Sequence, residues 1–184
     1  MKHLLIPPPV PRSRPQALLV IIALTCSGAP AAWAQGGAAP PPDSVLLRVD
    51  GEVARPLSLT AADFGTLPRR TVQGGLHGDP PADFEGVALE DLLRRAGAPL
   101  GSALRGDGLA LYVVVTAADG YRVVFALAEL DPGFTDRVVL LADRHAGRAL
   151  PADEGPLRVV VPGEKRGARW ARQVVRLTVQ RAPR

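Results

Sequence analysis

The chain has 184 residues, enough for one ordinary domain with appendages, and its 22 basic and 18 acidic residues leave a formal charge of +4. Hydrophobic residues make up 47% and charged residues 22%, which indicates a folded globular protein and excludes a disordered one. The single cysteine excludes an internal disulfide and a multi-thiolate zinc site, and 4% aromatic residues leave few rings for stacking on nucleic-acid bases.

The N-terminus has the layout of a secretory signal peptide. Basic residues precede the apolar run 17–24, and Ala32 and Ala34 occupy the −3 and −1 positions of a cleavage site. The run is shorter than the roughly 20 residues that a membrane-spanning helix needs. We therefore expect residues 1–34 to be removed, leaving a periplasmic or secreted protein without a membrane span. An uncleaved anchor and a lipoprotein attached through Cys26 are the alternatives.

Cleavage after Ala34 would lower the net charge of the chain and change its cysteine content. It would leave 150 residues with 19 basic and 18 acidic side chains, and it would remove the only cysteine. The next segment, residues 35–43, is rich in Gly, Ala and Pro and is predicted to be a flexible tether. The domain itself is predicted over residues 44–181.

The first half of this domain mixes short strands with a short helix. The residue pattern predicts strands over 45–53 and 57–59. Thr60 then caps a short helix that Pro68 ends. Residues 74–83 contain several glycines and prolines and are predicted to form a loop.

A clear helix and several strands follow. Apolar residues at helical spacing predict a helix over 89–96, which Gly97 ends. Valine-rich runs then predict a hairpin that turns at Asp119-Gly120, followed by three further strands. The predicted strands are 109–116, 121–127, 138–142, 157–161 and 173–179. Many strands and few short helices predict an α+β fold: a single mixed α/β domain.

Several kinds of catalytic chemistry are excluded. No serine of the domain lies in a nucleophile-elbow motif, and no cysteine remains after cleavage to act as a nucleophile. The sequence also has no P-loop and no dinucleotide-binding glycine motif after a strand. We therefore assign no catalytic residue.

One polar cluster raises the question of a metal site. His77 and Asp79 are followed closely by Asp83 and Glu85, and these side chains offer nitrogen and oxygen ligands. The domain has only one other histidine, His145, so it lacks the usual multi-histidine set. Structural or solvent-exposed roles are therefore favoured over metal binding, and no metal ligand is assigned.

Charge is distributed unevenly along the domain. Residues 35–154 hold 11 basic and 17 acidic side chains, whereas the remainder holds eight basic residues and one acidic residue. A Pro-Gly turn there presents Lys165, Arg166, Arg169 and Trp170 together. Arginine side chains and the backbone N–H groups of a glycine-containing loop suit a phosphate or another oxyanion. The alternative interpretation is a solvent-facing side of a terminal strand.

Three stretches carry a resemblance to a known family. They are Phe84-Glu-Gly-Val-Ala-Leu-Glu-Asp-Leu-Leu-Arg-Arg-Ala-Gly97, Asp119-Gly-Tyr121, and Gly155-Pro-Leu-Arg-Val-Val-Val-Pro-Gly163 with Arg169-Trp170. Together they resemble the oxidoreductase molybdopterin-binding domain, the core of the sulfite oxidase family, over most of residues 45–180. The resemblance implies that family's mixed α+β fold and a molybdopterin held by arginine, lysine and backbone groups. The candidate pocket residues are Gly74, His77, Tyr121, Arg158, Lys165, Arg169 and Trp170.

Two features depart from the family pattern. Enzymes of the family bind molybdenum through one cysteine, in a stretch that resembles Thr-Leu-Gln-Cys, and the corresponding stretch here is Thr71-Val-Gln-Gly74. Glycine offers no side-chain ligand, so the soft thiolate is lost. Members that carry the cofactor are usually exported folded through a twin-arginine signal, whereas this leader reads Arg12-Ser13-Arg14.

Two functional hypotheses follow. The first is a non-catalytic binding protein, with no cofactor, for a small anionic or pterin-like ligand or a periplasmic protein partner. The second is a sulfite-oxidase-like oxidoreductase subunit that binds molybdopterin without a protein thiolate, so the sequence leaves open whether the protein is an enzyme. Nucleic-acid binding is disfavoured, because the basic end lacks interleaved aromatic residues.

Overall fold

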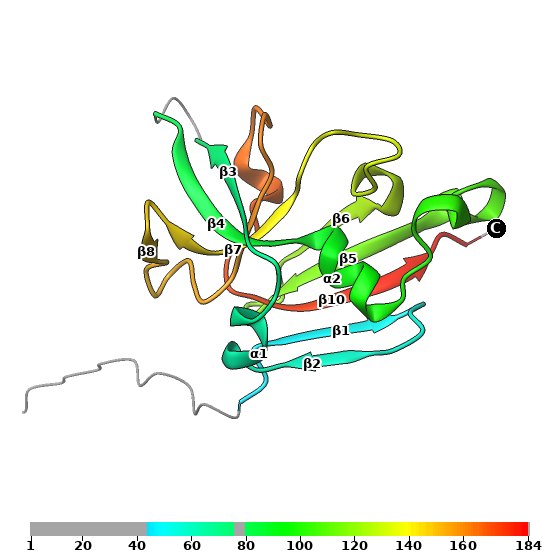
Figure 1. Cartoon of the computed structure of the whole chain (residues 1–184), viewed down its shortest axis with the longest axis horizontal. Coiled ribbons are helices and arrows are strands. Elements are labelled where there is room, and N and C mark those ends of the chain that lie inside the picture. Colours follow the sequence, from blue (N-terminus) through cyan, green and yellow to red (C-terminus); the bar gives the residue numbers. More distant parts are fainter. Residues whose placement is uncertain (1–43, 76–79, 184) are drawn as a thin grey trace, which may run out of the picture. The chain divides into compact units, whose positions relative to one another are not determined.

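The computed structural model describes residues 44–75 and 80–183. The predicted signal peptide, the predicted tether and His77 lie outside these ranges. Within them the chain forms two five-stranded sheets, two α-helices and four short 3-10 helices (Figure 1). The described residues contain no helix that is both long and apolar enough to span a membrane.

The first sheet joins the two ends of the described chain. Its strand order is β2-β1-β10-β5-β6. The strands are β1 (Leu47–Gly51), β2 (Leu57–Leu59), β5 (Leu111–Ala117), β6 (Arg122–Ala126) and β10 (Val174–Arg181). β1 and β10 pair in parallel, with Val49 opposite Leu177, and the other neighbours are antiparallel. Alternate residues of β5 are buried, so one face of the sheet covers the core.

The second sheet is antiparallel and is centred on β4 and β7. Its strands are β3 (Arg70–Gly74), β4 (Ala82–Ala88), β7 (Leu140–His145), β8 (Arg148–Ala149) and β9 (Arg158–Val160). β4 lies between β3 and β7, while β8 and β9 both pair with β7. β3 is therefore an edge strand, and it brings Gly74 opposite Ala82.

Local capping explains where the two α-helices begin and end. In α1 (Ala61–Gly65), the Thr60 hydroxyl accepts a hydrogen bond from the Asp63 backbone N–H, and the Asp63 carboxylate accepts one from the Thr60 backbone N–H. The Thr60 backbone N–H and the Thr60 hydroxyl both donate to the Asp63 carboxylate and lower its pKa below the ordinary value. α2 (Leu89–Ala96) ends at Gly97, whose φ of 72° lies in the left-handed region that glycine adopts most easily.

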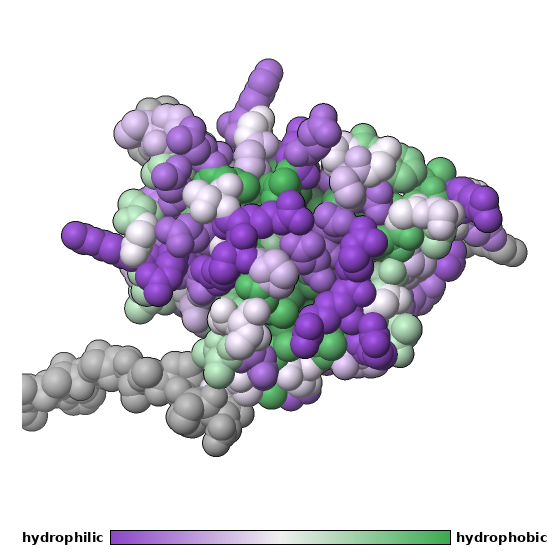
Figure 2. Space-filling view, viewed as in Figure 1, coloured by the Kyte–Doolittle hydropathy of each residue, from purple (hydrophilic) through white to green (hydrophobic). Residues whose placement is uncertain are grey.

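A single hydrophobic core joins the two sheets and α2. α2 contributes its buried face, and both sheets contribute alternating or continuous runs of Val and Leu. Around this core the surface is largely hydrophilic on the face seen in Figure 2, where hydrophobic residues show mainly in gaps between polar ones. The buried apolar area is the main source of stability for a domain of this kind.

The structure confirms most of the predicted elements and differs from the prediction mainly between residues 60 and 83. The strand-rich mixed α/β class, the helix over 89–96 and the hairpin of β5 and β6 are confirmed. The predicted loop 74–83 is wrong at both ends, because β3 ends at Gly74 and β4 begins at Ala82. The short helix capped by Thr60 ends at Gly65, before Pro68. β3 escaped prediction because four of its five residues are not buried, and its sequence carries no alternating apolar pattern.

Candidate functional site

Trp170 lies at the centre of the candidate site. It directly follows η4 (Gly167–Arg169) and is 4% exposed. Phe84 of β4 meets the indole edge-on, with ring centroids 5.6 Å apart. His145 of β7 stacks on Phe84, with ring centroids 4.3 Å apart. The second sheet therefore provides an aromatic wall against which the η4 loop packs.

Gly74 lies directly against the indole. A Cβ atom built at this position would be 2.6 Å from Trp170 Cη2 and 3.3 Å from Val160 Cγ1. The first distance is shorter than real Cβ contacts allow, so any side chain at residue 74 would displace the ring. The space that the resemblance assigns to a cysteine side chain is thus filled by Trp170.

Arg158 also belongs to this cluster. It begins β9, is 9% exposed and forms an ion pair with Glu154. Its guanidinium carbon lies 5.3 Å from the Trp170 ring centroid and 5.8 Å from that of Phe84. Within the described residues, Arg158 Nε and Trp170 Nε1 are buried and have no hydrogen-bond acceptor.

Tyr121 fastens the η4 loop to the first sheet. The residue precedes β6 at the turn of the hairpin, where Asp119 accepts a hydrogen bond of 2.8 Å from its backbone N–H. Its hydroxyl donates a hydrogen bond of 2.7 Å to the Ala168 carbonyl. Tyr121 therefore holds the loop that carries Trp170, and its ring remains half exposed.

A wide groove opens beside this cluster. It has a volume of about 720 Å³. Its lining includes Arg158 and Trp170, which carry the two buried donors, and the loop cations Lys165 and Arg166. The lining residues are Glu154, Arg158, Lys165, Arg166, Gly167, Ala168, Trp170 and Arg172.

Three of the four cations that line this groove are weakly neutralised. Lys165 and Arg166 are exposed and form no ion pair with any residue in the described part of the chain. Arg172 approaches Asp153 only to 4.0 Å, and both side chains are mostly exposed, so this pair contributes little. The groove therefore carries excess positive charge beside one carboxylate, Glu154, that is already paired.

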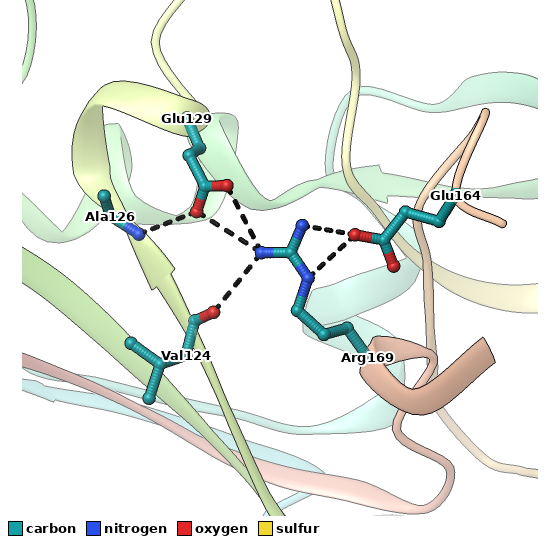
Figure 3. Close-up of polar contacts among 5 residues, drawn as sticks. All are labelled: Val124, Ala126, Glu129, Glu164 and Arg169. Atoms are coloured by element: carbon teal, nitrogen blue, oxygen red, sulfur yellow. Dashed lines mark hydrogen bonds and ion pairs between the residues drawn. The ribbon is translucent and has the colours of Figure 1, made fainter. Parts of the chain in front are cut away.

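Arg169 is not one of the residues that line the groove, and its guanidinium lies between Glu164 and Glu129 (Figure 3). Its Nε donates a hydrogen bond of 2.8 Å to Glu164, and its Nη1 lies 3.3 Å from both carboxylate oxygens of Glu129 and 3.5 Å from the Val124 carbonyl. Its guanidinium also lies 4.5 Å from the Phe125 ring centroid. Burial disfavours the charge, but the hydrogen bond to Glu164 and the charge of Glu129 outweigh it and raise the pKa of Arg169.

Arg169 and Glu129 bind backbone groups at the free edge of the first sheet. β6 is the last strand, so the N–H and C=O groups on its outer side lack a neighbouring strand. Arg169 caps the Val124 carbonyl, and Glu129 accepts a hydrogen bond of 3.0 Å from the Ala126 N–H. Arg169 thus anchors the η4 loop to the first sheet, as Tyr121 does.

Most of the sequence-predicted residues lie together. Gly74, Tyr121, Arg158, Lys165 and Trp170 all contact or line the region around the indole. Arg169 does not line the groove, and His77 lies outside the described residues.

Sequence reasoning missed the neighbours that complete this site. Phe84 was noted only as part of a family motif, and Glu154 was counted only as one of the acids of the domain body. The four-residue separation of Glu154 and Arg158 would have been a signal in a helix, but this segment is a loop leading into β9. In the described part of the chain, no three His, Cys, Asp or Glu side chains gather as a metal site would require.

Comparisons with known proteins bear on the fold and the family of the chain. The chain is similar to the sulfane dehydrogenase SoxCD from Paracoccus pantotrophus, with a TM-score of 0.56 and 25% sequence identity over 72% of this chain. The match spans 37% of that protein, so the chain corresponds to well under half of its relative. No curated protein sequence matches significantly. A family model described as the oxidoreductase molybdopterin binding domain matches residues 80–184, more than half of the sequence. Because the matched region contains β4, the hairpin and the η4 loop, the chain belongs to the oxidoreductase molybdopterin-binding domain family.

Proposed function

We propose that this chain is a non-catalytic member of its family that binds a small anionic ligand in the groove beside η4. The observation that carries the proposal is the contact between Gly74 and Trp170. At residue 74, which the sequence resemblance pairs with a metal-binding cysteine, the chain has no side chain and an indole ring fills the space. Residues 1–34 support a periplasmic or secreted location, because they have the layout of a signal peptide.

The residues present do not fit a molybdenum centre of the kind that the resemblance implies. Gly74 supplies no thiolate, and the described residues form no alternative set of three metal ligands. The two arginines expected at the cofactor are engaged as well, since Arg158 pairs with Glu154 and Arg169 with Glu164 and Glu129. We therefore derive no catalytic step through molybdopterin.

The groove supports anion binding through its charges. Lys165 and Arg166 line it without a carboxylate partner in the described ranges, and Arg172 reaches Asp153 only at 4.0 Å, so an anion would meet cations that are still available. Ammonium and guanidinium groups form their strongest hydrogen bonds with ionised oxygens. A groove of about 720 Å³ also lies within the size range of small-molecule sites.

The alternative function is a molybdopterin-dependent oxidoreductase subunit. Membership of the family and the similarity to a sulfane dehydrogenase favour it. In that case the cofactor would be held by its phosphate and pterin, and no protein thiolate would bind the metal.

Measuring bound metal and pterin separates the two functions. The full chain is produced in a host that synthesises molybdopterin, and the purified protein is analysed for molybdenum by mass spectrometry and for pterin by fluorescence after oxidation. We expect far less than one equivalent of either. A family enzyme that has the cysteine, purified in the same way, is the positive control. One molybdenum and one pterin per chain would overturn the proposal.

A further inference from the structure

We infer that the solvent-facing side of the first sheet binds an acidic segment of a partner protein through a row of three arginines. This face lies opposite the core, because its residues alternate with the buried residues of the same strands. Every residue of the face is at least partly exposed, and none of them lines the groove beside η4. The residues of the face are Ser58 on β2, Arg48 and Asp50 on β1, Arg176, Thr178 and Gln180 on β10, Tyr112, Val114 and Thr116 on β5, and Arg122, Val124 and Ala126 on β6.

The pairing register places the three arginines in one row across the strands. Arg176 of β10 lies directly opposite Arg48 of β1, and on its other side it lies opposite Thr116 of β5. Thr116 in turn lies opposite Arg122 of β6. Neighbouring strands are about 4.8 Å apart, so the row extends about 14 Å from the backbone of Arg48 to that of Arg122.

The charge of this row is only partly neutralised by the described residues. Asp50 binds Arg176 at 3.0 Å and is the one acidic residue of the face. Arg48 reaches the Ser58 hydroxyl at 3.4 Å, and Arg122 forms no hydrogen bond or ion pair within the described part of the chain. Like charges directly opposite each other destabilise a sheet, so the neighbouring Arg48 and Arg176 repel each other in the free protein. Carboxylates placed over the row would relieve this repulsion.

Charge and composition favour an acidic protein segment as the occupant. Guanidinium groups bind carboxylates through two parallel hydrogen bonds. Tyr112, Val114 and Val124 lie in the rows beside the arginines, and Val124 is 49% exposed. Arginine and tyrosine are enriched at protein interfaces. A second copy of this chain would bring two positively charged faces together, and anionic membranes attract clusters of about four to eight basic residues, more than this face holds.

The spacing of the arginines also describes the segment. In an extended chain every second side chain points the same way, and successive side chains on one side are about 6.8 Å apart. Acidic residues at positions i, i+2 and i+4 of such a segment would span about 14 Å, which is the extent of the arginine row. The segment would lie across the strands and be recognised through its side chains, because backbone pairing requires a free strand edge.

Fluorescence anisotropy with a labelled dodecapeptide of alternating Glu and Thr tests this face. The full chain is titrated into the peptide at low ionic strength. Arg48→Gln/Arg122→Gln removes two charges of the row, and we expect it to bind the peptide about fivefold more weakly, as for the loss of two exposed ion pairs.

A matched variant and a matched peptide serve as controls. Arg144→Gln/Arg148→Gln removes the same charge from exposed residues of the second sheet and should bind the peptide as the parent does. A peptide with Gln in place of every Glu should not bind. Thermal unfolding of each variant shows that it is folded.

Several outcomes would overturn the inference. The parent could fail to bind the peptide, Arg48→Gln/Arg122→Gln could bind it undiminished, or both double variants could lose the same affinity, which would be an effect of net charge. Sedimentation with phosphatidylcholine and phosphatidylglycerol vesicles tests the other occupant. If Arg48→Gln/Arg122→Gln lowers vesicle binding and leaves peptide binding unchanged, the face binds a membrane and not an acidic segment. The variants leave the groove beside η4 intact, so each of these outcomes is independent of the proposed function.

Discussion

At the scale of single residues, the contact between Gly74 and Trp170 distinguishes this chain from the pattern that it resembles. Glycine offers no side-chain ligand at residue 74, and that much is visible in the sequence. The structure adds that the indole fills the space beside this residue, with its Cη2 atom 2.6 Å from where a Cβ would lie. The two residues therefore form one packed unit, and restoring a side chain at residue 74 alone would not restore a metal site.

Gly74→Ala tests this packing directly. The added methyl group must push the indole or Val160 aside, and overpacking of this kind costs about 1–3 kcal/mol of unfolding free energy. The measurement is urea-induced unfolding of the full chain. Gly65→Ala is the matched control, because a Cβ at that position meets nothing within 4 Å, and its stability should change little. Equal stability of Gly74→Ala and the parent would contradict the packed contact.

At the scale of elements, the η4 loop depends on anchors in the first sheet. Arg169 binds Glu164 within the loop region and Glu129 and Val124 beside β6, while the Tyr121 hydroxyl binds Ala168. The loop is thus fastened to the hairpin on one side and packed through Trp170 against the second sheet on the other. These anchors place the indole over Gly74.

Arg169→Gln should therefore loosen the η4 loop. The substitution removes charged hydrogen bonds from a side chain that is 30% exposed, so we expect a loss of about 1–2 kcal/mol, reduced by solvent screening. Hydrogen exchange should accelerate at the backbone N–H of Trp170, which is bonded to Gly167. Arg166→Gln, on the same loop and exposed, is the control and should leave exchange unchanged. Unaltered exchange in Arg169→Gln would show that Arg169 is not an anchor.

The elements also show how far local sequence signals reach. The helix over 89–96 was predictable because its four buried residues repeat at helical spacing and a glycine ends it. β3 could not be predicted in this way, because most residues of this edge strand are exposed and show no apolar alternation. The strand is stabilised by its pairing with β4, and local sequence patterns give no signal of that pairing.

At the scale of the whole molecule, folding pairs the basic end with the acidic body. Arg176 pairs with Asp50 and Arg181 with Glu52, because β10 lies beside β1 in the first sheet. The solvent-facing interpretation is confirmed for Arg176, which is exposed. Much of the charge asymmetry along the sequence is therefore cancelled in space. The groove beside η4 is the place where Lys165 and Arg166 keep their charge uncancelled by the described residues.

Phosphate should consequently stabilise the whole domain. A ligand that binds only the folded state raises its stability by mass action, by about 2.7 kcal/mol at one hundred times the dissociation constant. Thermal unfolding in phosphate and in chloride of equal ionic strength measures this difference.

The charge-matched comparison identifies the cations responsible. Lys165→Gln/Arg166→Gln should lose most of the stabilisation by phosphate. Arg48→Gln/Arg105→Gln removes the same charge from exposed residues outside the groove and should keep the stabilisation. Equal loss in both double variants would mean that phosphate acts through net charge and not through the groove.

The sequence by itself determined the strand-rich mixed class, the helix over 89–96, the hairpin, the family and the absence of a cysteine at residue 74. These features depend on local periodicity, turn residues and the identity of single positions. Only the tertiary structure decided which cations are neutralised, which way Arg169 points and what fills the space beside Gly74. Those properties depend on residues that are distant in sequence and become neighbours when the two sheets and the η4 loop pack around a common core.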